Sequence, residues 1–373
     1  MKVKLFDTFN DIVSIKNLMG AWRDLLKGKQ NKKDIQFFSL HLMDNILALH
    51  YDLVNRTYQH GGYASFYIND PKRRHIHKAD VRDRLLHHAV YRILYPFFDK
   101  TFISDSFSCR NGKGTHRAVN QFRKMTCRAS KNNTATGWVL KCDIKKFFAS
   151  IDHKVLINIL NEYIQDKDIM LLLENIVESY MTVCHSRPVS PFCHSREGRN
   201  PVHGINSGGN PDDWRLDPRF HGDDSIDVGL PLGNLTSQLF ANVYMNVFDQ
   251  WVKHFLKARY YIRYADDFVF LSPDRQWLED IIPKIQKFLS ERLKLTLHPN
   301  KLFLKTIYSG MDFLGWINFP GHRILRRTTK RRMLAKIKNN PTPEALQSYL
   351  GLLKHGNTHK IKQELLGQYW LWQ

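Results

Sequence analysis

Two adjacent acids interrupt a run of bulky residues that favour β-strands. Asp266 and Asp267 stand between residues 260–265 and residues 268–271, which are rich in Tyr, Phe, Val and Ile. This pattern predicts two buried strands joined by a tight turn that displays both carboxylates. Two like charges held side by side favour a bound cation, and hard oxygen ligands suit Mg²⁺. A solvated turn without metal is the alternative for an isolated Asp-Asp pair.

A third acid stands where another apolar run ends. Asp143 follows the apolar residues 138–140, and a helical spacing of apolar residues begins at Val155. An acid at the end of a strand is well placed to share a metal with the hairpin. Two ions held by such acids would activate a 3′-hydroxyl and stabilise the departing pyrophosphate. The alternative for Asp143 is a helix N-cap.

The overall charge indicates a polyanionic partner. The chain of 373 residues has a net charge of +21 and a pI near 9.7. Residues 321–373 contain eleven Lys and Arg against two acids. A charged run is often only a solvated face, but an excess of this size favours a track for nucleic acid.

Other bulk features exclude several classes of protein. No apolar stretch is long enough to span a bilayer, and no signal-like apolar core follows the first residues. The cysteines are odd in number and scattered, which favours a reducing cytoplasm over a disulfide framework. They are Cys109, Cys127, Cys142, Cys184 and Cys193. We therefore expect a cytoplasmic protein that does not bind membranes.

Two further segments suggest contacts with phosphate. Arg110 and Lys113 stand among glycines that let backbone N–H groups approach an anion closely, although a plain basic turn is the alternative. Residues 293–301 are expected to form a strand ending in a turn that presents Lys301. A cation at this turn could protonate the departing pyrophosphate.

Residues 184–227 differ in composition from the rest of the chain. They are rich in His, Arg, Gly, Asn, Pro and Asp, and the run Cys-His-Ser-Arg at Cys184 recurs at Cys193. Zinc binding is disfavoured because adjacent Cys and His lack the usual two-residue spacer. The composition predicts a disordered loop insertion.

Taken together and in order, these segments resemble the reverse transcriptase family over roughly residues 70 to 320. The resemblance implies an α+β fold of the right-hand polymerase type, with fingers, a ferredoxin-like palm and a short helical thumb. We expect an N-terminal helical extension over residues 1–70 and fingers over 71–142. The palm, with its loop insertion at about 184–227, would cover 143–320, and a basic helical thumb 321–373.

The resemblance also implies roles for individual residues. The catalytic residues would be Asp143, Asp266, Asp267 and Lys301, and the metal-binding residues would be the three acids and Ile144. The expected nucleotide-binding residues are Arg110, Lys113, Phe148, Leu232, Gly233 and Gln238, with Phe148 as the aromatic gate against a ribose 2′-hydroxyl. The expected primer grip is Phe313, Leu314, Gly315 and Trp316. The implied cofactor is a pair of Mg²⁺ ions, with Mn²⁺ as an alternative, and the implied partners are template RNA, the cDNA/RNA hybrid and dNTPs.

One segment discriminates within the family. Most reverse transcriptases have Gln-Gly, three residues and Ser-Pro where this chain has residues 232–238, Leu-Gly-Asn-Leu-Thr-Ser-Gln. The change resembles diversity-generating retroelement enzymes, which copy a template RNA with frequent errors at adenines. An apolar Leu232 contributes shape without a hydrogen bond, so mispairs would be rejected less strongly. This branch implies a small basic accessory protein. The alternatives are a retron or group II intron-like enzyme and a catalytically silent RNA-binding scaffold.

Overall fold

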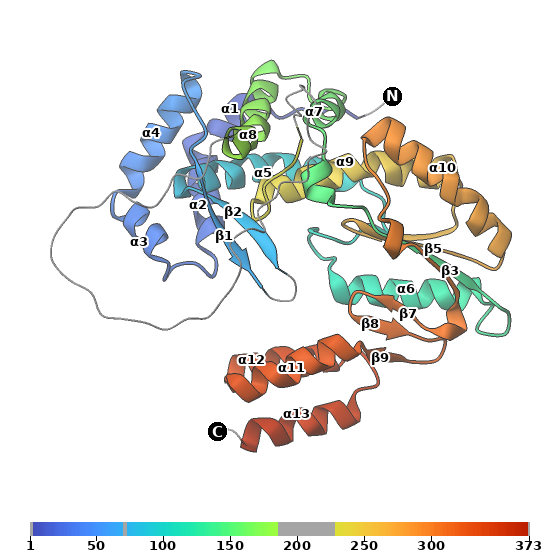
Figure 1. Ribbon diagram of the computed structural model, residues 1–373. Helices are drawn as coiled ribbons and strands as arrows, with labels where there is room; N and C mark the ends of the chain where they lie inside the picture. The colour runs from blue at the N-terminus through green and yellow to red at the C-terminus, as the bar shows by residue number, and fades with distance from the viewer. Residues whose placement is uncertain (1–2, 70–72, 186–227, 372–373) are drawn as a thin grey trace, which may run out of the picture.

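The N-terminal half of the protein is mostly helical. The computed structural model describes residues 3–69, 73–185 and 228–371 (Figure 1). Its first helices are α1 (Phe9–Val13), α2 (Ile15–Leu26), α3 (Lys33–Leu40) and α4 (Leu42–Val54). They pack around the long helix α5 (Val81–Thr101), and the antiparallel hairpin of β1 (Tyr63–Ile68) and β2 (Arg74–Ala79) lies beside them. Helices α7 (His153–Asn161) and α8 (Lys167–His185) complete this half.

A four-stranded antiparallel sheet forms the centre of the second half. Its strands are β3 (Trp138–Cys142), β4 (Tyr260–Tyr264), β5 (Asp267–Ser272) and β6 (Phe303–Thr306). With α9 (Leu235–His254) and α10 (Arg275–Leu293) they follow the order βαββαβ, and the strands lie as β4-β5-β3-β6. This is the topology of ferredoxin-like sheets. The mixed helix-and-sheet fold expected from the sequence is therefore present.

Both faces of this sheet are buried, because apolar side chains alternate between them. Phe268 and Phe270 pack into the cluster that contains α9 and α10. Val269 and Leu271 pack into a second cluster with α6 (Thr115–Ala129). Burial on both faces explains why the strand sequences read as nearly continuous apolar runs.

The C-terminal part joins a small sheet to a helical bundle (Figure 1). Strands β7 (Met311–Phe313), β8 (Trp316–Asn318) and β9 (Arg323–Leu325) precede α11 (Arg327–Asn339), α12 (Pro343–Leu353) and α13 (His359–Leu371). The loop before α13 docks on this sheet, since Asn357 N–H donates to the Arg323 carbonyl over 2.9 Å. A Cβ on Gly356 would lie 2.2 Å from the Trp316 ring, so only glycine fits here. None of the helices in the described part of the chain combines the length and apolar character needed to cross a bilayer.

The three domain boundaries expected from the sequence each cut through a structural unit. The boundary at residue 70 falls between β1 and β2, which pair along their whole length. The boundary at 142 separates β3 from the other strands of the four-stranded sheet, and α6 from most of the sheet against which it packs. The boundary at 320 separates β9 from β8. These expectations were wrong because hydrogen-bonded strands join segments across the changes in composition. Most of the predicted insertion, residues 186–227, lies outside the described residues.

The strand expected over residues 293–301 is also absent. Helix α10 continues to Leu293, and Lys294 ends it in the left-handed conformation with a φ of 51°. Beyond this cap, Leu297 makes only an isolated bridge to Ile144, and Lys301 lies in the short 3₁₀ helix η2 (Pro299–Lys301). The turn still presents Lys301, as the sequence predicted.

A buried ion pair joins α9 to strand β4. Arg263 and Asp249 are both 0% exposed, and their closest atoms, Nη2 and Oδ2, are 2.6 Å apart. All five guanidinium N–H groups have acceptors, which include Ser106, Asn242 and the carbonyl of Ala265 in the turn before Asp266. The pair therefore holds the turn of the β4–β5 hairpin against α9.

We predict that Asp249→Ala destabilises the protein strongly, because it leaves Arg263 charged, buried and unpaired. The free energy of unfolding in urea should fall by about 3–5 kcal/mol. The matched control is Glu291→Ala, which removes the exposed pair with Lys287 and should cost about 0–1 kcal/mol. Equal losses in the two variants would contradict this role for the buried pair.

Candidate active site

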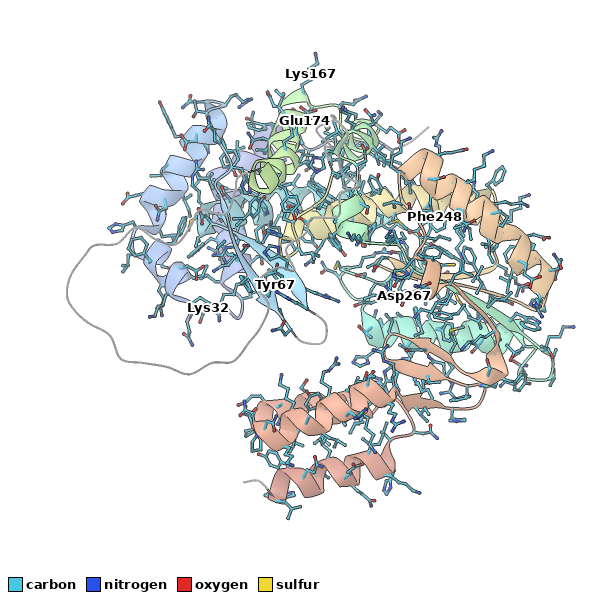
Figure 2. All side chains as sticks on the ribbon, viewed as in Figure 1. Lys32, Tyr67, Lys167, Glu174, Phe248 and Asp267 are labelled. Atoms are coloured by element: carbon cyan, nitrogen blue, oxygen red, sulfur yellow. The ribbon has the colours of Figure 1, made fainter. Side chains whose placement is uncertain are left out.

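Strand pairing brings the three predicted catalytic acids to one end of the sheet. Cys142 pairs with Phe268 in the antiparallel β3–β5 ladder, so Asp143 and Asp267 flank the same rung. Asp266 occupies the two-residue turn before β5, where Ala265 has a φ of 56°. Figure 2 shows Asp267 at the end of the sheet that faces the β1–β2 hairpin. The hairpin and the placement of Asp143 at a strand end agree with the sequence prediction.

Two lysines neutralise these carboxylates. Lys301 Nζ lies 2.9 Å from Asp143 Oδ1, and Lys141 Nζ lies 3.1 Å from Asp267 Oδ2. Lys141 also donates to the backbone carbonyl of Asp312 over 2.9 Å, which ties β7 to the site. The cationic charge is thus supplied from β3 and from η2, on either side of the acids.

The remaining negative charge alters the acidity of the hairpin acids. Burial, with the charge of Asp143, raises the pKa of Asp266. Burial raises the pKa of Asp267 to about 6; Lys141 opposes this rise, whereas Asp143 and Asp266 add to it. Asp267 Oδ1 is buried and has no hydrogen-bond partner. The acids of the site therefore keep negative charge that a further cation could neutralise.

The donor chemistry of the site fits a hard divalent ion. Carboxylate oxygens are the preferred ligands of Mg²⁺, and one such oxygen here is buried without a partner. Within the described residues, no group of three or more His, Cys, Asp or Glu side chains is arranged to hold a metal as it stands. Two of the three carboxylates are instead paired with Lys141 and Lys301. Ile144, also predicted to bind metal, has a buried side chain, so only its backbone could reach an ion.

The structure commits Arg110 to a different role from the one predicted. Its guanidinium is buried and bonds Asp99 through Nε over 2.7 Å. Nη1 donates to the carbonyls of Ile103 and Ser106, and Nη2 donates to the carbonyl of Asp99. A guanidinium engaged in this way holds the loop after α5 rather than a nucleotide, so the prediction for Arg110 is corrected.

Lys113 is also engaged with the protein. Its Nζ donates to the Ser104 carbonyl over 2.8 Å and lies 5.0 Å from the centre of the Phe107 ring. Burial and the charge of Arg110 lower the pKa of Lys113. It lines a cavity of about 360 Å³ beside α6, together with Arg117 and Lys124.

The other predicted nucleotide-binding residues divide into two groups. Leu232 accepts a 2.9 Å hydrogen bond at its carbonyl from His77 N–H of β2, and Gly233 has a φ of 121° beside Ile76. Phe148 joins this group, since its carbonyl accepts from Leu230 N–H over 2.7 Å. Gln238 lines a cavity of about 190 Å³, and Gly233 and residues of α2 and α5 line it as well.

The predicted primer grip consists of two kinds of residue. Phe313 and Trp316 are buried in the cluster beneath α6, so they are core residues and cannot contact a primer. Leu314 and Gly315 form the turn between β7 and β8, with φ values of 53° and 85°. Only this turn could reach a strand of nucleic acid.

Two cations at the site were not predicted from the sequence. Lys141 precedes Asp143 by two positions, and alternation along β3 places both side chains on one face. The charge of Arg74, at the start of β2, opposes the rise in the pKa of Asp266. The tip of the hairpin therefore lies within electrostatic range of the acids. The strongly basic run at residues 72–78 was the available signal for Arg74.

The fold and the site are consistent with a template-directed polymerase. The chain belongs to the reverse transcriptase (RNA-dependent DNA polymerase) family, since the sequence model of this family matches residues 69–318. This result confirms the family predicted from the sequence.

Several named proteins are similar to parts of the chain. Protein YkfC of Escherichia coli is 22% identical over 305 residues, 71% of this chain and 66% of that protein. The putative COX1/OXI3 intron 2 protein of Saccharomyces cerevisiae is 27% identical over 216 residues, covering 48% of this chain and 23% of its own length. The nuclear intron maturase 1, mitochondrial, of Arabidopsis thaliana is 28% identical over 94 residues, 25% of this chain and 12% of that protein. This chain thus spans about two thirds of the bacterial relative and under a quarter of the other two.

We predict that Asp267→Asn stabilises the metal-free protein above about pH 6. The folded-state pKa of about 6 exceeds the ordinary 3.8, so native protein binds more protons than the unfolded chain between these values. The contribution of Asp267 to stability therefore falls as pH rises through this window. From pH 4 to pH 7, the free energy of unfolding of the variant relative to wild type should rise by on the order of 2–3 kcal/mol.

Urea unfolding at a series of pH values measures this difference. Asp280→Asn changes an exposed acid on α10 and should show no trend with pH. A constant difference between Asp267→Asn and wild type would contradict the shifted pKa.

Proposed function

We propose that this chain is an RNA-directed DNA polymerase that makes cDNA from a template RNA. The observation that carries the proposal is the convergence of Asp143, Asp266 and Asp267 at adjacent strand ends, with raised pKa values on the hairpin acids. These acids would hold two Mg²⁺ ions, or Mn²⁺ in their place. When bound, the ions would supply neutralising charge for the 3′-hydroxyl and the triphosphate.

Two cationic residues of the chain have roles in this proposal. Lys301 Nζ donates to Asp143 Oδ1 over 2.9 Å, and from this position at the edge of the site it would protonate the departing pyrophosphate. Arg74 begins β2 at the tip of the β1–β2 hairpin, where its guanidinium would bind the triphosphate. Arg74 thus takes the part that the sequence had assigned to Arg110.

The packing supports an assignment of the parts of the proposed right hand. The sheet β4-β5-β3-β6 with α9 and α10 is the palm, and the β1–β2 hairpin with α5 provides the fingers. Helices α11 to α13 are the thumb, and α11 has six Lys and Arg and no acid in its 13 residues. This basic helix would hold the cDNA/RNA hybrid through phosphate contacts.

Specific observations favour two types of retroelement, and a retron enzyme is a further alternative. Leu232, whose carbonyl is fixed to β2, supports an error-prone enzyme of a diversity-generating retroelement working with a small basic accessory protein. The names of the yeast and plant relatives refer to introns, which supports a group II intron-like enzyme. Fidelity opposite template adenines separates the two.

We predict that the double variant Asp266→Ala, Asp267→Ala lowers primer extension on an RNA template by at least about 1000-fold, or roughly 4 kcal/mol in activation free energy. Mg²⁺ should raise the melting temperature of wild type but not of this variant, which tests the metal site independently of activity. Asp280→Ala on α10 is the control and should behave as wild type. Equal extension by wild type and the double variant would support the RNA-binding scaffold instead.

We predict that Leu232→Gln lowers misincorporation opposite template adenine several-fold, because an amide that hydrogen-bonds the correct base rejects bases that leave it unpaired. Sequencing of cDNA from one template measures the error spectrum. Leu235→Gln, three residues along the same segment, controls for the added amide. A wild-type enzyme that copies adenine accurately would exclude the mutagenic retroelement and leave the retron and group II intron-like assignments.

A further inference from the structure

The outer face of α3 and α4 carries a stripe of exposed apolar side chains. Along α4, four of them recur at spacings of four, four and three residues, which places them on one side of the helix. Two more continue the stripe on α3. The six residues are Phe37, Leu40, Met43, Leu47, Tyr51 and Val54, and each is between 45% and 75% exposed.

Helix α4 is therefore apolar on both sides. Its inner side is fully covered, since Ile46, Leu49 and Leu53 are buried in the main core. Single exposed apolar residues are ordinary, but a contiguous row marks a surface that another molecule covers. The two helices lie at the edge of the protein away from the four-stranded sheet (Figure 1).

The charges of this face exclude nucleic acid as its partner. Residues 35–54 contain no Lys or Arg, although the whole chain carries a net charge of +21. The acids on α4 are Asp44 and Asp52. A polyanion would meet apolar and acidic groups here, whereas a second copy would meet a patch from which the repelling cations are missing.

The stripe is complementary to itself. In an antiparallel pair of α4 helices with the two-fold axis at Leu47, Leu47 meets its own copy, and Met43 meets Tyr51 of the partner copy. A thioether against an aromatic ring is a favourable contact, and the Tyr51 hydroxyl would lie beside the exposed carboxylate of Asp44 from the partner copy. We propose that the protein forms an isologous dimer through α4, with the ends of α3 extending the interface.

The size of the patch sets the expected strength of this dimer. Six side chains exposed to this extent present on the order of 600 Å² per copy, slightly below the roughly 800 Å² of a standard interface. We therefore expect association in the micromolar range. The dimer does not depend on polymerase activity, so its test is separate from that of the proposed function.

Sedimentation of the full chain between about 1 and 100 µM, in salt high enough to suppress charge repulsion, measures the association. Wild type should dimerise, and Leu47→Asp should weaken the dimer at least about tenfold. Leu171→Asp is the control, since Leu171 is also exposed but lies on α8, and it should leave the dimer unchanged. Circular dichroism checks that each variant is folded.

A second variant tests the two-fold axis itself. A cysteine at position 47, made by Leu47→Cys, should be linked between copies by a short bis-maleimide, whereas Val54→Cys at the end of α4 should react much less. The native cysteines make wild type the baseline for both. A monomer at 100 µM, a dimer that survives Leu47→Asp, or equal linking at the two positions would overturn the proposal.

Discussion

Crowding of like charges at the end of the sheet is the constraint on which the rest of the site depends. Three carboxylates stand at neighbouring strand ends, and burial makes their mutual repulsion stronger than it would be in water. Lys141 and Lys301 offset part of the negative charge, and Arg263 holds the turn before Asp266 by donating to the Ala265 carbonyl. Because these cations come from β3, η2 and β4, the site forms only when distant segments have docked.

Local pattern was sufficient to predict the centre of this site. The hairpin at Asp266 and Asp267 and the strand end at Asp143 depend on alternation, turn chemistry and the end of an apolar run, which are properties of neighbouring residues. The mixed fold followed from the same patterns. The alternation of side chains along β3 also predicts that Lys141 lies on the same face as Asp143, two positions further on.

The features that sequence reasoning missed depend on partners far apart in the chain. Nothing near Arg110 indicates that Asp99, at the end of α5, holds its guanidinium. The domain boundaries failed because strand ladders cross them. Phe313 and Trp316 differ from these features, because their placement was predictable from neighbouring residues. Both flank a two-residue turn, and hairpin geometry places directly paired residues on one face of the sheet.

The missing side chain at Gly356 has a mechanical consequence for the helical bundle. The loop before α13 rests directly on Trp316 and hydrogen-bonds the Arg323 carbonyl, so close packing and a neutral hydrogen bond set its distance from the small sheet. The neighbouring pair of Arg326 and Asp312 and the attraction of basic α11 for a polyanion both weaken as salt is added. The fit against the indole does not, so added salt would weaken the charged contacts of the bundle and leave the loop seated on the small sheet.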